Sequence, residues 1–480
     1  MKPFMFFLFI YVATALPGQA TLDRVVSDFA AASAFRHATV GVSVRSIGSG
    51  RELADRNAEL SLIPASTQKL LTTAAAMDIL GADYRFRTRL VAGGDINAGT
   101  LSGDLYIIGG GDPTLGSSYM EGVPDLEAVL DGWVAAVRKR GIRRITGAIV
   151  GDGSYYGTAG TGRGWPWADL GNYYGAGVHG LNLNENAYEL IFSQRPAEGS
   201  TPPVSGTEPE IPELAFINEL RSGPSGSGDN AYIFGAPYNY THYIRGTIPR
   251  GSGRFRIRGA VPDPPLLAAQ LLRKKLVAAG ISVDEPATSD RLFAGRLREG
   301  EQLLETKSPT LAEIAERTNM RSVNLYAEAL LREVNKSAGT PLHELGSTDA
   351  IVDWLDSRNL PTESVRLRDG SGLDPRNFFS PSFMTAFLVD RAGEDDWLET
   401  IPVAGRSGSL RNTLRGTAAE GRVRAKSGTV NAVRAYAGYV DRPDGERLAF
   451  SVVVNNYSSS SRGVSQLLYA FMRDLVTAKL

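Results

Sequence analysis

The sequence of 480 residues contains no cysteine and few histidines; the four are His37, His179, His242 and His343. Without cysteine the chain has no thiol nucleophile, no cysteine-bound zinc and no disulfide. No two histidines have the spacing of a helical metal site, either as HExxH or four residues apart. We therefore expect chemistry that uses neither histidine nor metal, and no cofactor.

Charge of one sign is not in excess, because 51 Lys and Arg stand against 52 Asp and Glu and the formal net charge is -1. Proteins that bind nucleic acid neutralise phosphates with a basic surplus, and no Lys/Arg-rich run is present. Nucleic acid is therefore not expected as a partner. The 42% of hydrophobic residues are enough to build cores for about two to three domains at roughly 150 residues each.

Long apolar runs are absent beyond the N-terminus. Residues 1–20 are typical of a secretory signal peptide, with Lys2 before an apolar stretch from Phe4 to Leu16 and small residues up to Ala20. A retained membrane anchor is the alternative. A stretch of about 13 residues is too short to span the bilayer, which needs about 20, so we expect an exported protein with no stable membrane insertion after signal removal.

The rest of the chain divides into three regions of different pattern. Residues 21–85 show a period-2 run at Val40, Val42 and Val44, which predicts a hairpin, and then a helix from about 66 to 80. Residues 86–305 are rich in Gly and Pro, with short strands. From 306 onward, helices give way to strands near 422–426, 433–439 and 448–454. A last helix has apolar residues at helical spacing and few basic ones, so we expect it to face the core and not a membrane.

With no histidine or cysteine, a nucleophile is sought among hydroxyls with a lysine as base. Ser66 and Lys69 stand three residues apart at a probable helix start, so that both side chains lie on one helix face. A lysine acts as a base near pH 7 only if burial or another cation lowers its pKa, so a second lysine is expected nearby. Taken alone, the pair also fits a capped helix with an exposed lysine.

Two more motifs follow in the chain. Ser322-Val323-Asn324 stands at a break between two amphipathic helices, and Lys426-Ser427-Gly428-Thr429 ends a predicted strand. The combination S-x-x-K, S-D-N and K-T-G is the signature of penicillin-binding proteins and class A β-lactamases, and three corresponding motifs stand here in this order.

The chain resembles the class C low-molecular-mass penicillin-binding proteins, which are periplasmic D-alanyl-D-alanine carboxypeptidases and endopeptidases. The resemblance covers nearly the whole mature chain, and the interval between Ser66 and Ser322, more than half of the sequence, is far longer than in class A β-lactamases. Its further motifs are Gly103–Tyr106, Gly111–Leu115, Gly164–Asp169, Asp369–Leu373 and Pro402–Gly405.

This resemblance implies an α/β (α+β) fold, with a β-lactamase/transpeptidase-like catalytic domain built from both chain ends and interrupted by insertions. We expect residues 21–85 and 306–480 in the catalytic domain, 86–109 and 191–305 in an inserted β-rich domain, and 110–190 in a nested third domain. It also implies a location in the periplasm.

The resemblance further implies roles for the site residues. Ser66 attacks the carbonyl of the penultimate D-alanine of a peptidoglycan stem peptide, Lys69 takes its proton, Ser322 near Lys426 passes a proton to the leaving amine, and Asn324 orients Lys69. Backbone N–H groups of Ser66 and Thr429 form the oxyanion hole. Ser427, Gly428, Thr429 and Lys426 bind the terminal carboxylate, and β-lactam antibiotics act as inhibitors that acylate Ser66.

Three positions depart from the family pattern or have two interpretations. Ser427 stands where the family usually has threonine, and Asp374-Pro375 displaces Arg376 from the place of a family arginine. Asp152 matches a family acidic residue that meets a substrate side-chain amine, but it also fits a simple turn beside glycines. Trp165, Trp167, Tyr173 and Tyr174 form either one wall of the cleft or the core of the insertion.

Two other functions remain as alternatives. A serine β-lactamase needs a positioned base for deacylation, and we find no local feature for one after the first motif. A non-catalytic peptidoglycan-binding protein would be expected to lose at least one of Ser66, Lys69, Ser322 and Lys426, and all four are present.

Overall fold

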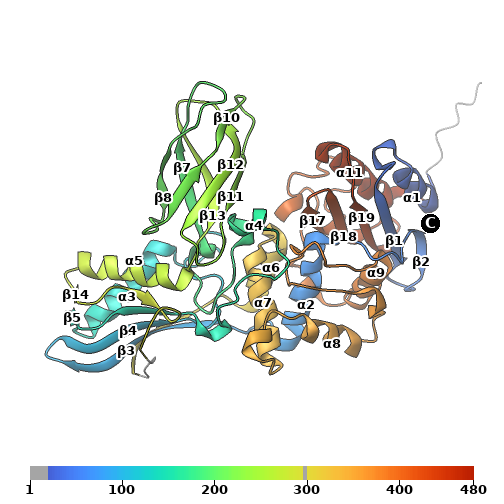
Figure 1. Cartoon of the computed structure of the whole chain (residues 1–480). Helices are drawn as coiled ribbons and strands as arrows, with labels where there is room; N and C mark the ends of the chain where they lie inside the picture. The colour runs from blue at the N-terminus through green and yellow to red at the C-terminus, as the bar shows by residue number, and fades with distance from the viewer. Residues whose placement is uncertain (1–19, 296–299) are drawn as a thin grey trace, which may run out of the picture.

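The computed structural model describes residues 20–295 and 300–480. Both chain ends contribute to one antiparallel sheet of order β17-β18-β19-β1-β2 (Figure 1). Its strands are β1 (Thr39–Ser46), β2 (Glu52–Arg56), β17 (Val423–Val430), β18 (Val433–Asp441) and β19 (Arg447–Asn455). The predicted pairing of the N-terminal hairpin with the strand-rich tail is confirmed. We call residues 20–86 and 308–480 the terminal domain.

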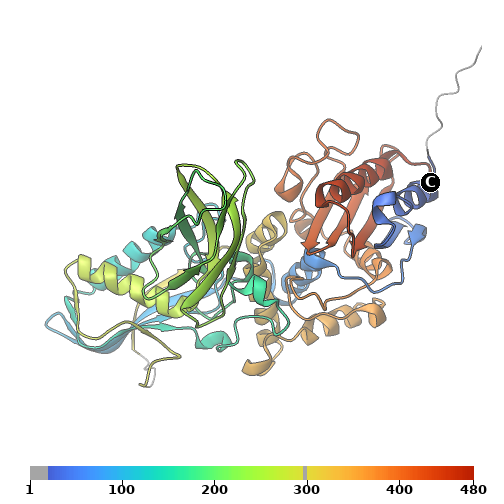
Figure 2. The same ribbon diagram turned by 45° about the horizontal axis from the view of Figure 1, so that its top comes forward.

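Helices cover both faces of this sheet (Figures 1 and 2). On one face lie α1 (Leu22–Ala30) and α11 (Ser461–Thr477), which share a core with the strands. The other face is covered by α2 (Lys69–Leu80), α6 (Leu311–Arg321), α7 (Asn324–Ser337), α8 (Asp349–Ser357), α9 (Pro381–Asp390) and α10 (Asp395–Leu398). In α11, Val464, Leu468, Phe471 and Leu475 are buried, so the last helix faces the core as expected.

A seven-stranded sheet forms the part of the insertion that joins the terminal domain. It contains β3 (Arg87–Asn97), β4 (Thr100–Ile108), β5 (Arg144–Ile145), β6 (Ile149–Asp152), β14 (Ser282–Val283), β15 (Thr288–Ser289) and β16 (Glu301–Lys307). Helices α3 (Leu126–Lys139) and α5 (Pro264–Ala278) share its apolar core. This part of the insertion is therefore a sheet covered by two helices.

A β-sandwich emerges from the same insertion and stands upright in Figure 1. Its two sheets consist of β7 (Ala187–Ser193), β8 (Val204–Glu208) and β13 (Arg254–Ala260), and of β9 (Ala215–Asn218), β10 (Arg221–Gly223), β11 (Asn230–Phe234) and β12 (Thr241–Pro249). Both sheets contribute to one core, in which Phe192, Ile233 and Ile257 are buried.

The strand pairing divides the insertion differently from the prediction. Residues 144–152, assigned to a nested domain at 110–190, pair with β4, β14 and β15 in the seven-stranded sheet. The unit nested inside that sheet is the sandwich of residues 187–260, most of which was assigned to the surrounding domain. The two-residue strands β5, β14 and β15 complete the sheet. Strands this short leave no recognisable hydrophobic pattern in the sequence.

A buried carboxylate joins the insertion to the terminal domain. Glu333 on α7 accepts hydrogen bonds from the hydroxyls of Tyr84 (2.7 Å), Tyr155 (3.1 Å) and Tyr156 (2.7 Å). Tyr155 and Tyr156 belong to the short helix η3 (Ser154–Tyr156) of the insertion. Hydrogen bonds to a charged acceptor are among the stronger ones in proteins, so this cluster holds the two units in a defined relation.

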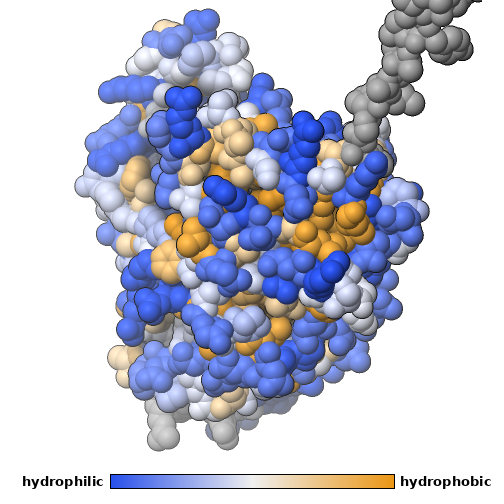
Figure 3. All heavy atoms as spheres, turned by 90° about the vertical axis from the view of Figure 1, so that its right-hand side faces the viewer, coloured by the Kyte–Doolittle hydropathy of each residue, from blue (hydrophilic) through white to orange (hydrophobic). Residues whose placement is uncertain are grey.

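Hydrophilic residues cover most of the face of the terminal domain in Figure 3, and apolar ones show between them. Among the described residues, no helix has both the length and the apolar character needed to cross a membrane. The predicted signal peptide lies almost entirely outside the described residues.

Candidate active site

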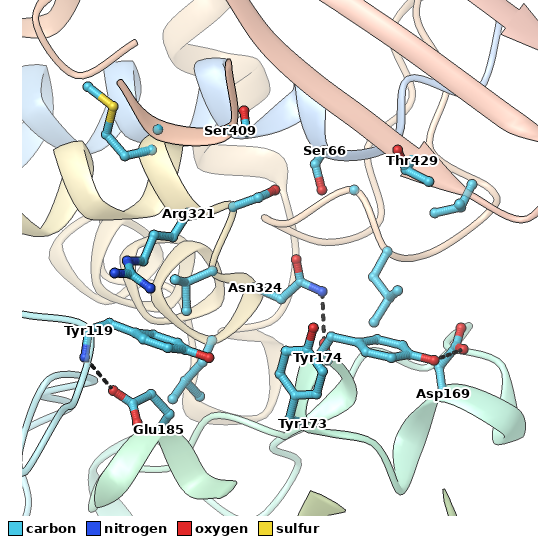
Figure 4. A pocket seen from close by; sticks show the side chains of 18 of the residues that line it. Ser66, Tyr119, Asp169, Tyr173, Tyr174, Glu185, Arg321, Asn324, Ser409 and Thr429 are labelled. Atoms are coloured by element: carbon cyan, nitrogen blue, oxygen red, sulfur yellow. Dashed lines mark hydrogen bonds between the residues drawn. The ribbon is translucent and has the colours of Figure 1, made fainter. Parts of the chain in front are cut away.

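The cavity that contains Ser66 has a volume of about 1390 Å³ and lies where the insertion faces the terminal domain (Figure 4). Ser66, Ser322, Asn324 and Thr429 line it from the terminal domain. Tyr119, Asp169, Tyr173, Tyr174, Glu185 and Arg258 line it from the insertion. The three predicted motifs therefore meet in one place, and the insertion supplies the opposite wall.

Ser66 lies in a short 3-10 helix, η2 (Ala65–Gln68), that continues directly into α2. The Nζ atom of Lys69 lies 2.9 Å from Ser66 Oγ, as the i,i+3 spacing predicts. The same amine donates to Asn324 Oδ1 and to the carbonyl oxygen of Ser371, both at 2.6 Å. The amine of Lys69 is thus held by the nucleophile itself and by two further oxygens.

Burial lowers the pKa of Lys69 to about 7, while the nearby carboxylates of Asp369 and Glu328 act in the opposite direction. Neither carboxylate forms a hydrogen bond or ion pair with the amine; both accept hydrogen bonds from backbone N–H groups of residues 370–374. Lys69 is therefore neutral for a substantial fraction of the time near pH 7, which a general base requires.

The expected second lysine is Lys426 on β17. Its fully buried amine donates to Ser322 Oγ and to the carbonyl oxygen of Ser427, both at 2.9 Å. Burial, and secondarily the charge of Lys69, hold the pKa of Lys426 well below its ordinary value. Ser322 occupies a left-handed backbone conformation (φ 59°) between α6 and α7, at the predicted helix break.

The backbone around Ser66 is tightly enclosed. A Cβ atom at Gly428 would lie 2.5 Å from the carbonyl oxygen of Pro64, and one at Gly372 would lie 2.0 Å from that of Ala65. Both glycines thus allow β17 and the 369–374 loop to approach Ser66. The N–H of Ser66 belongs to a first helical turn, where no intrahelical acceptor exists, so it is free to face an oxyanion.

Two hydrogen bonds connect the insertion to this machinery. Asn324 Nδ2 donates to the carbonyl oxygen of Tyr174 at 2.8 Å, and Trp165 Nε1 donates to the buried carboxylate of Asp369 at 2.9 Å. Tyr173 and Tyr174 line the cavity, as one interpretation of the aromatic group predicts. Trp165 is instead buried against Asp369, and Trp167 is 53% exposed and packs on Phe234.

The residues after Lys426 lie along the cavity or beside it. Thr429 lines it, and its hydroxyl accepts from Arg434 at 2.7 Å, a residue directly opposite on β18. Ser427 donates to Ser409 Oγ at 3.2 Å, and Ser409 lines the cavity. These hydroxyls, with the Lys426 amine behind them, can bind a carboxylate.

Asp152 does not line the cavity, which corrects its prediction as a substrate-binding residue. It ends β6 and accepts from the backbone N–H of Ser154 at 2.9 Å, which is the turn role that was the alternative. The acidic residue that does line the cavity near Asn324 is Asp169, whose carboxylate accepts from the Tyr174 hydroxyl at 3.0 Å (Figure 4). Burial raises the pKa of Asp169.

Several residues of the site were not predicted as such. Asp169 and Asp369 lie inside the motifs Gly164–Asp169 and Asp369–Leu373, and only their placement in space shows what they contact. Glu328, Arg434 and Arg321, the last of which also lines the cavity, carry no sequence signal of their own. Among the described residues, no group of three or more His, Asp or Glu is arranged to hold a metal ion.

The chain is similar to several known proteins. Residues 21–471 match the D-Ala-D-Ala carboxypeptidase 3 (S13) family. A D-alanyl-D-alanine carboxypeptidase from a species of Actinomadura is 31% identical, over 91% of this chain and 80% of its own. The crystal structure of penicillin binding protein 4 from Haemophilus influenzae is 25% identical with a TM-score of 0.78, over 94% of this chain and 98% of its own. A β-lactam complex of the same Haemophilus protein also matches, at 24% identity over the same shares of the two chains and a TM-score of 0.74.

The pKa of Lys69 leads to a prediction about pH. Acylation of Ser66 by penicillin should rise with pH through a midpoint near 7, because only neutral Lys69 accepts the proton. Asp369→Asn removes a negative charge that favours protonated Lys69, so the midpoint should move down by about one unit. The measurement is the acylation rate by intact mass between pH 5 and 9. Asp152→Asn is the matched control and should keep the wild-type midpoint; an unchanged midpoint in Asp369→Asn would contradict the assignment.

Proposed function

The chain belongs to the D-Ala-D-Ala carboxypeptidase 3 (S13) family and is a serine-type D-Ala-D-Ala carboxypeptidase, and we propose that Ser66 and Lys69 carry its chemistry on peptidoglycan stem peptides. The observation that carries the proposal is the 2.9 Å contact between Ser66 Oγ and the buried amine of Lys69. A hydroxyl held by a neutral amine is an activated nucleophile.

In the acylation step, Ser66 Oγ attacks the carbonyl carbon of the penultimate D-alanine while Lys69 takes the hydroxyl proton. The backbone N–H groups of Ser66 and Thr429 stabilise the oxyanion, and losing one such donor costs about 3 kcal/mol in enzymes of this type. The C–N bond then breaks as Ser322, which accepts a hydrogen bond from Lys426, passes its proton to the leaving amine and is reprotonated with the proton that Lys69 took from Ser66. The terminal D-alanine departs with the proton from Ser322.

The terminal carboxylate is assigned to the hydroxyls beside Ser66. Thr429 Oγ1 accepts from Arg434, so its own hydrogen is free to donate to an anion. Ser427 supplies a second hydroxyl, and behind it the Lys426 amine donates hydrogen bonds to Ser322 Oγ and to the carbonyl oxygen of Ser427. Gly428 allows the strand to pass close to Ser66. Water then hydrolyses the ester and restores Ser66.

The Ser66 and Lys69 assignments are tested together. Ser66→Ala should abolish both D-alanine release from a pentapeptide and the mass adduct with benzylpenicillin. Lys69→Arg should lower both rates at least about a thousandfold, because arginine keeps the charge but does not deprotonate. Wild type should hold penicillin as a long-lived ester while it turns over the pentapeptide. Steady hydrolysis of penicillin near 10 s⁻¹ would instead favour a β-lactamase, and an adduct on folded Ser66→Ala would reject the nucleophile.

We propose that Asp169 takes the role first assigned to Asp152 and receives the side-chain amine of the stem peptide. It lines the cavity, accepts a hydrogen bond from the Tyr174 hydroxyl, and forms no ion pair with any residue that the structure describes. Asp169→Asn should raise KM about tenfold for a substrate with a free side-chain amine, and leave the N-acetylated analogue within about twofold. Equal effects on the two substrates would contradict this role.

We further propose that the enzyme also cuts D-alanyl cross-links, because these present the same bond to Ser66. Its place of action is proposed to be the periplasm, on the basis of the signal-like residues 1–20. N-terminal sequencing of the exported protein should then begin at Thr21, and an intact N-terminus would contradict cleavage at this point.

A further inference from the structure

One outer face of the β-sandwich carries aromatic residues where polar ones are usual. Side chains of a strand alternate between the core and the solvent, and the solvent side of a sandwich sheet is ordinarily polar. In the sheet of β9, β10, β11 and β12, Ile233 and Ile244 point into the core. Their neighbours Tyr232, Phe234 and Tyr243 therefore face outward, and Tyr232 is 47% exposed. The packing of the sandwich does not require aromatic residues on this face.

The other sheet of the same sandwich shows the ordinary pattern. On its outer face, Arg256 of β13 forms ion pairs with Glu189 of β7 and Glu208 of β8. Phe255 and Ile257, on either side of Arg256, belong to the core side. The two sheets share one core, yet only the first has an apolar outer face. Contiguous exposed apolar patches commonly mark interaction sites.

The aromatic surface consists of four residues, which we call the aromatic platform: Trp167, Tyr232, Phe234 and Tyr243. Trp167, the first residue of α4 (Trp167–Leu170), packs on Phe234 with ring centroids 5.0 Å apart. Phe234 stands directly opposite Tyr243 in the sheet, and Tyr232 stands opposite Arg245. The Cζ atom of Arg245 lies 5.2 Å from the ring centroid of Phe234 and 5.5 Å from that of Tyr243. The four rings therefore form one surface.

The charge beside these rings is balanced. Arg245 Nε lies 2.5 Å from Glu219 Oε2, so the guanidinium has its counter-charge. Thr241 and Thr247 lie on the same side of β12 as Arg245 and add hydroxyl groups. A ligand that matches this surface has flat apolar faces and hydrogen-bonding groups at its edges, without a need for net charge. Sugar rings have this character, because their C–H groups form the faces and their hydroxyls the edges.

The aromatic platform is continuous with the active-site cavity. Tyr232 lines the cavity, and Trp167 stands two residues before Asp169 in α4, which packs beside β11 (Figure 1). Asp169 is the residue proposed to receive the side-chain amine of the stem peptide, in the half that becomes the acyl group. That half is also the one joined covalently to a glycan strand. The platform therefore lies next to the part of the cavity from which the glycan extends.

We propose that the aromatic platform binds the glycan strand to which the stem peptide is attached, with sugar rings stacked chiefly on Trp167 and Tyr232. The ligand class is a chain of N-acetylated hexosamines. Binding there holds the strand while its stem peptide occupies the cavity, and no bond forms or breaks at the platform. The inference rests on the proposed function, because it takes the substrate to be peptidoglycan, and it adds a second binding site for that substrate.

Two substrates with the same pentapeptide test the inference, one free and one attached to an uncross-linked glycan strand. Trp167→Ala should raise KM for the attached pentapeptide about fivefold and keep kcat/KM for the free one within about twofold, because Trp167 does not line the cavity. Trp167→Phe keeps a ring and should restore most of the affinity. Because Trp167 shares a helix with Asp169, Tyr243→Thr is the second variant, with a rise of about threefold expected.

The matched control is Arg256→Ala, on the outer face of the other sheet, which should leave both substrates unaffected. Glycan strands freed of their stem peptides provide a direct probe in titration calorimetry: wild type should bind them, and Trp167→Ala should raise Kd about fivefold. An unchanged KM for the attached pentapeptide in both variants, or equal losses on the two substrates, would overturn the inference.

A wild type that does not bind the peptide-free glycan, as expected if the platform docks a protein instead, would also overturn it, with the proposed function intact. A wild type that releases D-alanine from neither pentapeptide would overturn the proposed function itself.

Discussion

The site depends on two lysine amines that are buried without an ion pair. Lys69 and Lys426 are both fully inaccessible to solvent, and every hydrogen bond of their amines goes to a neutral oxygen. An isolated ammonium is costly in such surroundings, so the neutral amine becomes accessible near pH 7. A direct carboxylate partner would restore the ordinary pKa and remove the base. Asp369 and Glu328 are close enough to moderate the effect, but their oxygens are occupied by backbone N–H groups.

This burial requires a backbone that folds tightly around the amines. Ala65 (φ 48°), which precedes Ser66, and Ser322 (φ 59°) itself adopt left-handed backbone conformations. Such conformations cost about 1–3 kcal/mol each in residues other than glycine. The cores on both faces of the five-stranded sheet offset that cost, because they hold η2, β17 and the α6–α7 junction in place. The rigid sheet and helices thus maintain strained segments that would otherwise relax.

The sequence revealed those parts of the site that depend on local spacing. Ser66 and Lys69 share a helix face by their three-residue interval, and the strands of the terminal domain show clear apolar patterns. The sequence did not reveal parts that depend on distant segments meeting. Asp152 stands between two glycines and Asp169 between Ala168 and Leu170, and only the fold places Asp169 at the cavity. The division inside the insertion was not visible in the sequence, because strands of two residues complete its main sheet.

The insertion is part of the site and not an accessory to it. Tyr174 accepts a hydrogen bond from the asparagine that holds Lys69, and Trp165 donates to the carboxylate that faces Lys69. Between these two contacts lies the segment that carries Asp169. A substrate bound against this wall therefore contacts a segment that is hydrogen-bonded to Asn324 and Asp369. Glu333 on α7 also accepts hydrogen bonds from Tyr155 and Tyr156 of the insertion and from Tyr84 of the terminal domain, so the wall of the cavity that the insertion supplies is hydrogen-bonded to the domain that carries the nucleophile.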